Sequence, residues 1–117
     1  MEQELYQEAL QITDSAIQAV KPDAAVKRAL SEMPHSGRIF LVAAGKAAWQ
    51  MADAAVKTLG QMEDGVVVTK YGHVKAEIPG VRCYEAGHPV PDANSFAATE
   101  KALELVHGLH PEDTVLF

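Results

Sequence analysis

The chain has 117 residues and 48% hydrophobic content, which suits one globular domain able to bury its own core. Its net charge of −6, with only 10 Lys and Arg, disfavours nucleic acid as a partner, and no run approaches the roughly 18 apolar residues of a membrane span. The acidic start Met1–Glu4 lacks signal-peptide features, and the single cysteine, Cys83, cannot form an internal disulfide, so a cytoplasmic protein is predicted.

Two helices are predicted at the start of the chain. The first covers about residues 2–20, because apolar residues recur on one helical face: Leu5, Ala9, Ile12, Ala16 and Val20. Pro22 is a favourable first helical residue, and residues 24–32 form a second, shorter helix. The segment Pro34–Gly37 that follows is typical of a loop.

A strand and a third helix come next. The continuous apolar run Ile39–Ala44 is typical of a strand that is covered on both faces. After Gly45, apolar residues recur with the i, i+3, i+4 spacing of a helix. Gly60 is placed to end that helix as its C-cap.

Two further strands are predicted over Gly65–Lys70 and Val81–Glu85, the second holding Cys83 as a buried, inert thiol. The direction of the second strand is open. Only about ten residues connect the two strands, fewer than the dozen or so that a helical crossover needs. An antiparallel strand would carry Gly87 and His88 to the edge of the sheet opposite Gly45 and Lys46, whereas a parallel strand would bring them together.

The last part of the chain reads as a helix and a strand. Asp92 is predicted to cap a helix over about Ala93–His107, with its larger apolar side chains facing inward: Phe96, Leu103 and Val106. Thr114–Phe117 has the pattern of another buried strand. Because the chain stops inside that pattern, we expect it to be the first part of a longer polypeptide.

The order of these elements predicts the fold class. Helices alternate with apolar strands, as in a doubly wound α/β fold with a mostly parallel sheet between layers of helices. The length fits a single domain, residues 1–117, which would be incomplete if the last strand is cut short.

Three apolar runs end at a glycine beside a cationic or titratable side chain: Phe40–Lys46, Val66–His73 and Cys83–Pro89. In an open α/β sheet, ligands bind beyond the carboxyl ends of the strands, and glycine lets the backbone approach them closely. Four side chains there supply positive charge or hydrogen-bond donors: Lys46, Lys70, His73 and His88. In an acidic chain, this pattern indicates a small anionic ligand.

Each of these segments also has a purely structural interpretation. Gly45–Lys46 lacks the flanking residues of a Walker A loop, so it is either an anion-binding helix start or a solvated lysine beside a turn. Residues 70–73 are alternatively a polar loop tip, and His88 a packed loop histidine. A dinucleotide site is disfavoured, because the three-glycine fingerprint is absent and Lys70 stands where an acid is expected. No metal site is predicted, since the histidines show no ligand spacing.

Taken together and in order, the segments Val42–Ala48, Gly65–His73 and Glu85–Asp92 closely resemble the amino-terminal domain of type II glycerate kinases, which are also labelled hydroxypyruvate reductases. The resemblance covers essentially the whole chain. It implies a Rossmann-like three-layer domain whose active site lies in a cleft shared with a smaller carboxyl-terminal domain. The activity it implies is transfer of phosphate from ATP to D-glycerate.

The resemblance also implies roles for individual residues. Lys46 matches the active-site lysine, and the loops after the strands line the substrate and nucleotide cleft: Gly45, Lys70, Tyr71, Gly72, His73, Gly87, His88 and Pro89. ATP and Mg²⁺ are the implied cofactors, although no acidic ligand pair for Mg²⁺ is identifiable. In the family, a Ser- and Gly-rich phosphate loop follows the strand that stops here at Phe117.

We therefore expect the chain by itself to lack kinase activity and to self-associate as a homo-oligomer, through exposed strand edges or apolar helix faces. Two other classes of function remain open. One is a hydroxypyruvate-reducing oxidoreductase, and the other is a non-catalytic module that binds a sugar phosphate or another anion.

Overall fold

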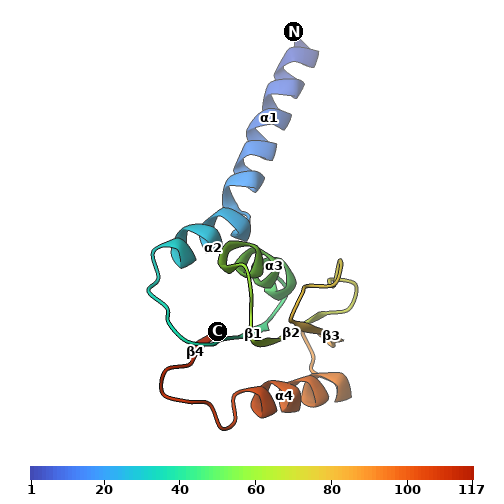
Figure 1. Cartoon of the computed structure of the whole chain (residues 1–117). Coiled ribbons are helices and arrows are strands. Elements are labelled where there is room, and N and C mark those ends of the chain that lie inside the picture. Colours follow the sequence, from blue (N-terminus) through green and yellow to red (C-terminus); the bar gives the residue numbers. More distant parts are fainter.

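The computed structural model describes all residues, 1–117, as four helices and four strands (Figure 1). The elements are α1 (Glu2–Val20), α2 (Pro22–Ser31), β1 (Ile39–Ala44), α3 (Ala48–Leu59), β2 (Asp64–Lys70), β3 (Arg82–Ala86), α4 (Ala93–Leu105) and β4 (Thr114–Leu116). The predicted turn residues have the predicted roles. Pro22 opens α2, and Gly60 ends α3 with a left-handed φ of 84°, which glycine adopts without strain.

The four strands form one parallel sheet in the order β3-β2-β1-β4. The open direction of the third strand is thereby resolved: β3 pairs parallel to β2, with Val66 opposite Arg82 and Lys70 opposite Ala86. No helix makes this connection. A loop returns the chain to the start of β3, braced by an isolated bridge between Ile78 and Val81.

Helices cover the sheet on both faces, which makes an α/β structure of three layers (Figure 1). Because successive strand residues point to opposite faces, Leu41 and Val67 pack toward α3, whereas Phe40 and Val66 pack toward α4. Val66 and Val67 are fully buried. The sheet is thus filled on both sides, as the continuous apolar runs predict.

The predicted inward face of α4 is wrong. Phe96 and Leu103 are 68% and 63% exposed, and Val106 is also exposed. The residues that face the sheet are Ala98 and Leu105, on the opposite side of the helix. Two apolar rows run along this helix, and the row with small alanine side chains is the one that lets it lie close to the strands.

The prediction that the last strand is buried is also wrong. β4 pairs only with β1 and forms an edge of the sheet. Val115 is 41% exposed and Phe117 is 96% exposed. Only Leu116 of this strand packs against the core cluster of α3, and the outer edge of β4 has no neighbouring strand.

The first helix stands apart from the three layers. Every residue of α1 is exposed, and the helix projects away from the body of the molecule (Figure 1). This projection makes the molecule 64 Å long against 36 and 19 Å in the other directions. The next helix, α2, packs on α3 through Val26 and Leu30. None of the helices combines the length and hydropathy needed to cross a membrane.

Candidate functional site

The carboxyl ends of β1, β2 and β3 meet at one edge of the sheet, because all three strands run parallel. The three glycine-containing segments of the sequence follow these strand ends directly. Residues 45–46, 70–73 and 87–89 therefore lie along the same edge. This is the arrangement that the sequence left open.

Gly45 and Lys46 form the turn between β1 and α3. Gly45 has a φ of 124°, which other residues rarely adopt, and its N–H donates to the carbonyl of Val68 at 3.0 Å. The carbonyl oxygen of Lys46 accepts from Thr69 Oγ1 at 3.4 Å and lies 3.2 Å from His73 Nδ1. Since a carbonyl only accepts, the His73 contact requires a hydrogen on Nδ1. The Lys46 side chain is exposed.

The Glu85 carboxylate shapes the loop after β2. One of its oxygens, Oε2, accepts from the N–H of Gly72 at 2.8 Å and from that of Val74 at 3.2 Å. These two donors flank His73 in the sequence. Glu85 thus fixes the segment that holds the His73 ring against Lys46.

The Asp92 carboxylate joins three parts of the site. It accepts from the Tyr71 hydroxyl at 2.6 Å, and through its other oxygen it caps α4 by accepting from the Ser95 N–H at 3.1 Å. The Asn94 side chain donates to the same Tyr71 oxygen at 2.9 Å. The Tyr71 hydroxyl and the Gly87 backbone lower the pKa of Asp92 to about 2. Asp92 therefore links the loop after β2, the loop after β3 and the start of α4.

The loop after β3 passes close to this carboxylate. A Cβ on Gly87 would lie 2.5 Å from the carbonyl oxygen of Val90 and 3.0 Å from Asp92, so no larger residue fits there unless the backbone moves. The His88–Pro89 peptide bond is cis. Both residues are exposed, and the His88 ring has no hydrogen bond or ion pair within the chain.

The charges at this edge leave the cations unpaired. Lys46 and Lys70 form no ion pair, as is true of four further basic residues of the chain. The basic residues that bond to carboxylates lie away from this edge: Arg38, Lys57, Arg82 and Lys101. The nearby carboxylates of Glu85 and Asp92 accept from neutral donors instead. An anion at the start of α3 would meet the Lys46 ammonium group and the partial positive charge of the helix terminus.

A largely apolar cavity of about 620 Å³ opens beside Lys46. It lies between α2, α3 and the ends of β1 and β4, and it is bounded by Gly45, Met51 and Phe117. Because β2 and β4 flank β1 on opposite sides, this is the point where the strand order reverses, the usual ligand crevice of an open α/β sheet.

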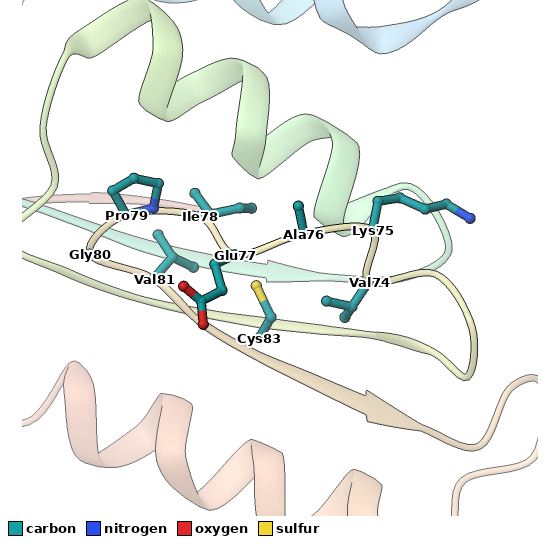
Figure 2. Close-up of a pocket in the computed structure, with 9 residues that line it drawn as sticks. All are labelled: Val74, Lys75, Ala76, Glu77, Ile78, Pro79, Gly80, Val81 and Cys83. Atoms are coloured by element: carbon teal, nitrogen blue, oxygen red, sulfur yellow. The ribbon is translucent and has the colours of Figure 1, made fainter.

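A second depression, of about 790 Å³, lies under the loop between β2 and β3 (Figure 2). It is lined by residues 74–81 and by Cys83, whose pKa is raised by burial. None of the site residues predicted from the sequence lines it. Figure 2 shows its side chains along the loop itself, so we place the candidate site at the strand ends and not here.

The described residues do not fit a divalent cation. No group of three or more His, Cys, Asp or Glu side chains converges in the structure. The two carboxylates closest to the site, Glu85 and Asp92, already accept hydrogen bonds that hold the loops. No step that involves Mg²⁺ is therefore assigned to this chain.

The structure places the predicted residues along one edge but links only some of them directly. His73 contacts the carbonyl groups of Lys46 and Lys70, and Gly87 contacts Asp92, the partner of Tyr71. His88 and Pro89 make no such polar contact. The sequence interpretation did not predict that Glu85 holds the loop after β2, and it predicted for Asp92 only the role of a helix cap. A carboxylate at the end of a strand, next to glycine-rich loops, was the available signal.

Comparisons with known proteins identify relatives of this chain. Residues 8–117 match the sequence pattern of a protein family, DUF4147, which is described as a domain of unknown function. A D-glycerate 2-kinase from Thermotoga maritima is 52% identical over 110 residues, which are 93% of this chain and 26% of that protein. A glycerate 2-kinase from Pyrococcus horikoshii is 35% identical over 91% of this chain and 26% of that protein.

A solved structure has the same fold as this chain. The crystal structure of a glycerate kinase from Thermotoga maritima superposes with a TM-score of 0.89 and 50% identity, over 98% of this chain and 28% of that one. A protein from Agrobacterium vitis named "Putative hydroxypyruvate reductase" is 41% identical over 90% of this chain. The chain thus spans about a quarter of the length of the curated glycerate kinases that it matches.

Proposed function

The chain belongs to the DUF4147 family and matches the amino-terminal part of type II glycerate kinases, and from this premise we propose that it forms one wall of a kinase active site. The reaction is transfer of a phosphoryl group from ATP to D-glycerate. The observation that carries the proposal is the exposed, unpaired Lys46 at the start of α3, beside His73 and the strand-order reversal.

The chemistry of phosphoryl transfer suits this edge. The reaction needs positioning and neutralisation of charge more than covalent chemistry. Lys46 neutralises charge on the transferred phosphate, as a fixed cation in a closed cleft can do. Lys70 and His88 supply further donors, and the backbone of Gly45, Gly72 and Gly87 allows close approach. The loop residues Tyr71, His73 and Pro89 line the same wall.

The chain supplies only part of such a site. We propose that it is the amino-terminal part of a Rossmann-like domain in a cytoplasmic enzyme, and that alone it does not turn over substrate. With one wall of the cleft, a bound phosphate stays in water, where charge–charge attraction is weak. A homo-oligomeric state is also proposed, and the open edge of β4 with its exposed Phe117 offers a surface for it.

A reductase acting on hydroxypyruvate is the second candidate, favoured by the name of the relative from Agrobacterium vitis. Two features of this chain count against it. The glycine fingerprint of dinucleotide sites is absent, and β2 ends in Lys70 where such a site uses an acid for the ribose.

A graft separates the candidates. This chain would replace the matching segment of the Thermotoga maritima D-glycerate 2-kinase, and the graft would be assayed with ATP and D-glycerate, and separately with NADH and hydroxypyruvate. ATP-dependent phosphorylation of glycerate is expected. A folded graft that oxidises NADH and makes no phosphoglycerate would contradict the proposed kinase activity and support the reductase. A folded graft that binds glycerate or phosphate but shows neither activity would support an anion-binding module.

A further inference from the structure

The first helix is the part of the molecule that lacks a partner. All 19 residues of α1 are exposed, so no part of this chain buries any of them. In proteins, most of the stability of a helix comes from packing of its amphipathic face and not from helix propensity. α1 also contains β-branched residues, which favour helices less. Its helical state therefore calls for a surface that covers it.

One side of α1 is built to be covered. Leu5, Ile12 and Val20 are 60%, 71% and 81% exposed, although their spacing puts them on one helical face. Tyr6 and Ile17 widen this face and are also more than half exposed. The opposite side carries glutamines, among them Gln11 and Gln18, and acids lie at the borders between the two sides. A helix that is apolar along one face and polar along the other belongs against an apolar surface.

The charge on α1 disfavours a second copy of this chain as the cover. The helix carries Glu2, Glu4, Glu8 and Asp14 and no basic residue. Two copies packed helix against helix would bring these like charges near one another, with no compensating Lys or Arg. The complementary surface is apolar at its centre and basic at its rim.

The position of α1 is shared with a much longer relative. The superposition on the Thermotoga maritima kinase takes in 98% of this chain. Because α1 makes up 19 of the 117 residues, nearly all of α1 is part of the match. This chain corresponds to only 28% of that structure. The matching helix therefore belongs to a protein in which nearly three-quarters of the chain lies outside the match and is available to pack on it.

We propose that the apolar face of α1 is a docking surface for the polypeptide that corresponds to the remaining three-quarters of a glycerate-kinase chain. The contact anchors the two parts of the cleft to each other at a distance from Lys46. The inference rests on family membership and on the exposure of α1, and not on the proposed kinase activity. Its test accordingly reads stability and amide protection instead of turnover.

The experiment compares this chain alone with the graft into the Thermotoga maritima kinase. The test variant is Leu5→Lys/Ile12→Lys, and the matched control is Gln11→Lys/Gln18→Lys, which adds the same charge on the polar side of α1. Lysine is at least as good a helix former as isoleucine, so lost helix propensity does not explain an effect. Melting temperature and hydrogen exchange of the α1 amides are measured for every protein.

In the graft, the test variant is expected to lower the melting temperature by several degrees, and the control to leave it unchanged. The α1 amides of the unmodified graft should be protected at least about tenfold more than those of the chain alone. Equal melting temperatures for the test and control variants would overturn the proposal. A folded graft whose α1 amides are no better protected than those of the chain alone would also overturn it. So would α1 protection in the chain alone that rises with concentration, because a second copy would then be the occupant.

Discussion

The two ends of the sheet use their carboxylates in different ways. At the amino-terminal end, carboxylates pair with arginines. Asp113, before β4, accepts two hydrogen bonds from Arg38, before β1, at 2.7 and 3.0 Å. Asp64 at the start of β2 pairs with Arg82 at the start of β3 at 3.1 Å.

At the carboxyl end, the carboxylates bind neutral donors. Asp92 accepts from the Tyr71 hydroxyl and Glu85 from backbone N–H groups, while Lys46 and Lys70 have no acidic partner. The difference separates two tasks. At one end ion pairs join neighbouring strands, and at the other end neutral donors hold the loops and leave Lys46 and Lys70 without an acidic partner.

The largest expected effect concerns this available charge. In the active graft, Lys46→Met should lower turnover at least about a hundredfold, the scale of losing one preorganised charge donor. Lys57→Met is the matched control, because Lys57 pairs with Asp53 on the exposed side of α3. Turnover is measured by release of ADP with D-glycerate. Near-normal turnover in a folded Lys46 variant would contradict the proposed catalytic role of Lys46 at the carboxyl end of the sheet.

The next effect concerns the loop after β3. Gly87→Ala should destabilise the chain by about 1–3 kcal/mol, the usual cost of forcing extra volume into a packed site, because the new Cβ meets the Val90 carbonyl at 2.5 Å. Gly60→Ala is the comparison, since a Cβ there meets no atom within 4 Å and only its left-handed φ of 84° opposes the substitution. Urea unfolding of both variants measures the difference. Equal costs would show that the loop yields easily.

The strands and helices were largely predictable because apolar periodicity reports burial. The run Ile39–Ala44 and the cap at Gly60 were confirmed as predicted. The face of α4 was not, because Phe96 and Ala98 lie on competing apolar rows, and the fit against the sheet selects the smaller residue. Periodicity within one helix carries no information about that fit.

The site was predictable only in its outline. Glycine after a strand marks a turn, and the parallel direction of β3 then brings the turns together. The direction of β3 was open because a loop, and not a helix, joins it to β2. The contact of Glu85 with two backbone N–H groups also escaped prediction, because nothing in local sequence shows which loop folds back on a strand.

A smaller effect is expected at His88. It is exposed and has no polar partner in the chain, so His88→Ala should leave the melting temperature unchanged and weaken glycerate or phosphate binding to the graft several-fold. Binding and melting are measured on the same sample. His107→Ala is the control, because His107 is also exposed and lies just beyond the carboxyl end of α4. A loss of stability with unchanged affinity would assign His88 to packing.

The pKa of Asp92 tests how the carboxyl end is held. Its folded pKa of about 2 lies below the ordinary 3.8, so the stabilisation is complete above pH 3.8 and is lost as the pH falls through about 2. Tyr71→Phe removes the largest cause and should raise the pKa of Asp92 toward its ordinary value. NMR titration of the carboxyl group measures this, with Tyr6→Phe as control. An unchanged pKa would assign the effect to the donors of Gly87 and Ser95.

The smallest effect is expected at the amino-terminal end, at the ion pair between Arg82 and Asp64. Both side chains are more than 40% exposed, and exposed pairs gain little because water screens their attraction and holding two long side chains costs entropy. Arg82→Gln should therefore change the free energy of unfolding by less than about 1 kcal/mol.

Arg38→Gln should lower the free energy of unfolding by more. Its partner Asp113 has a side chain only 2% exposed, and this carboxylate would lose two donors while remaining covered. Urea unfolding of both variants, in low and high salt, measures the contrast. If the two arginines cost the same, ion pairing would not be what holds β1 and β4 together at this end of the sheet.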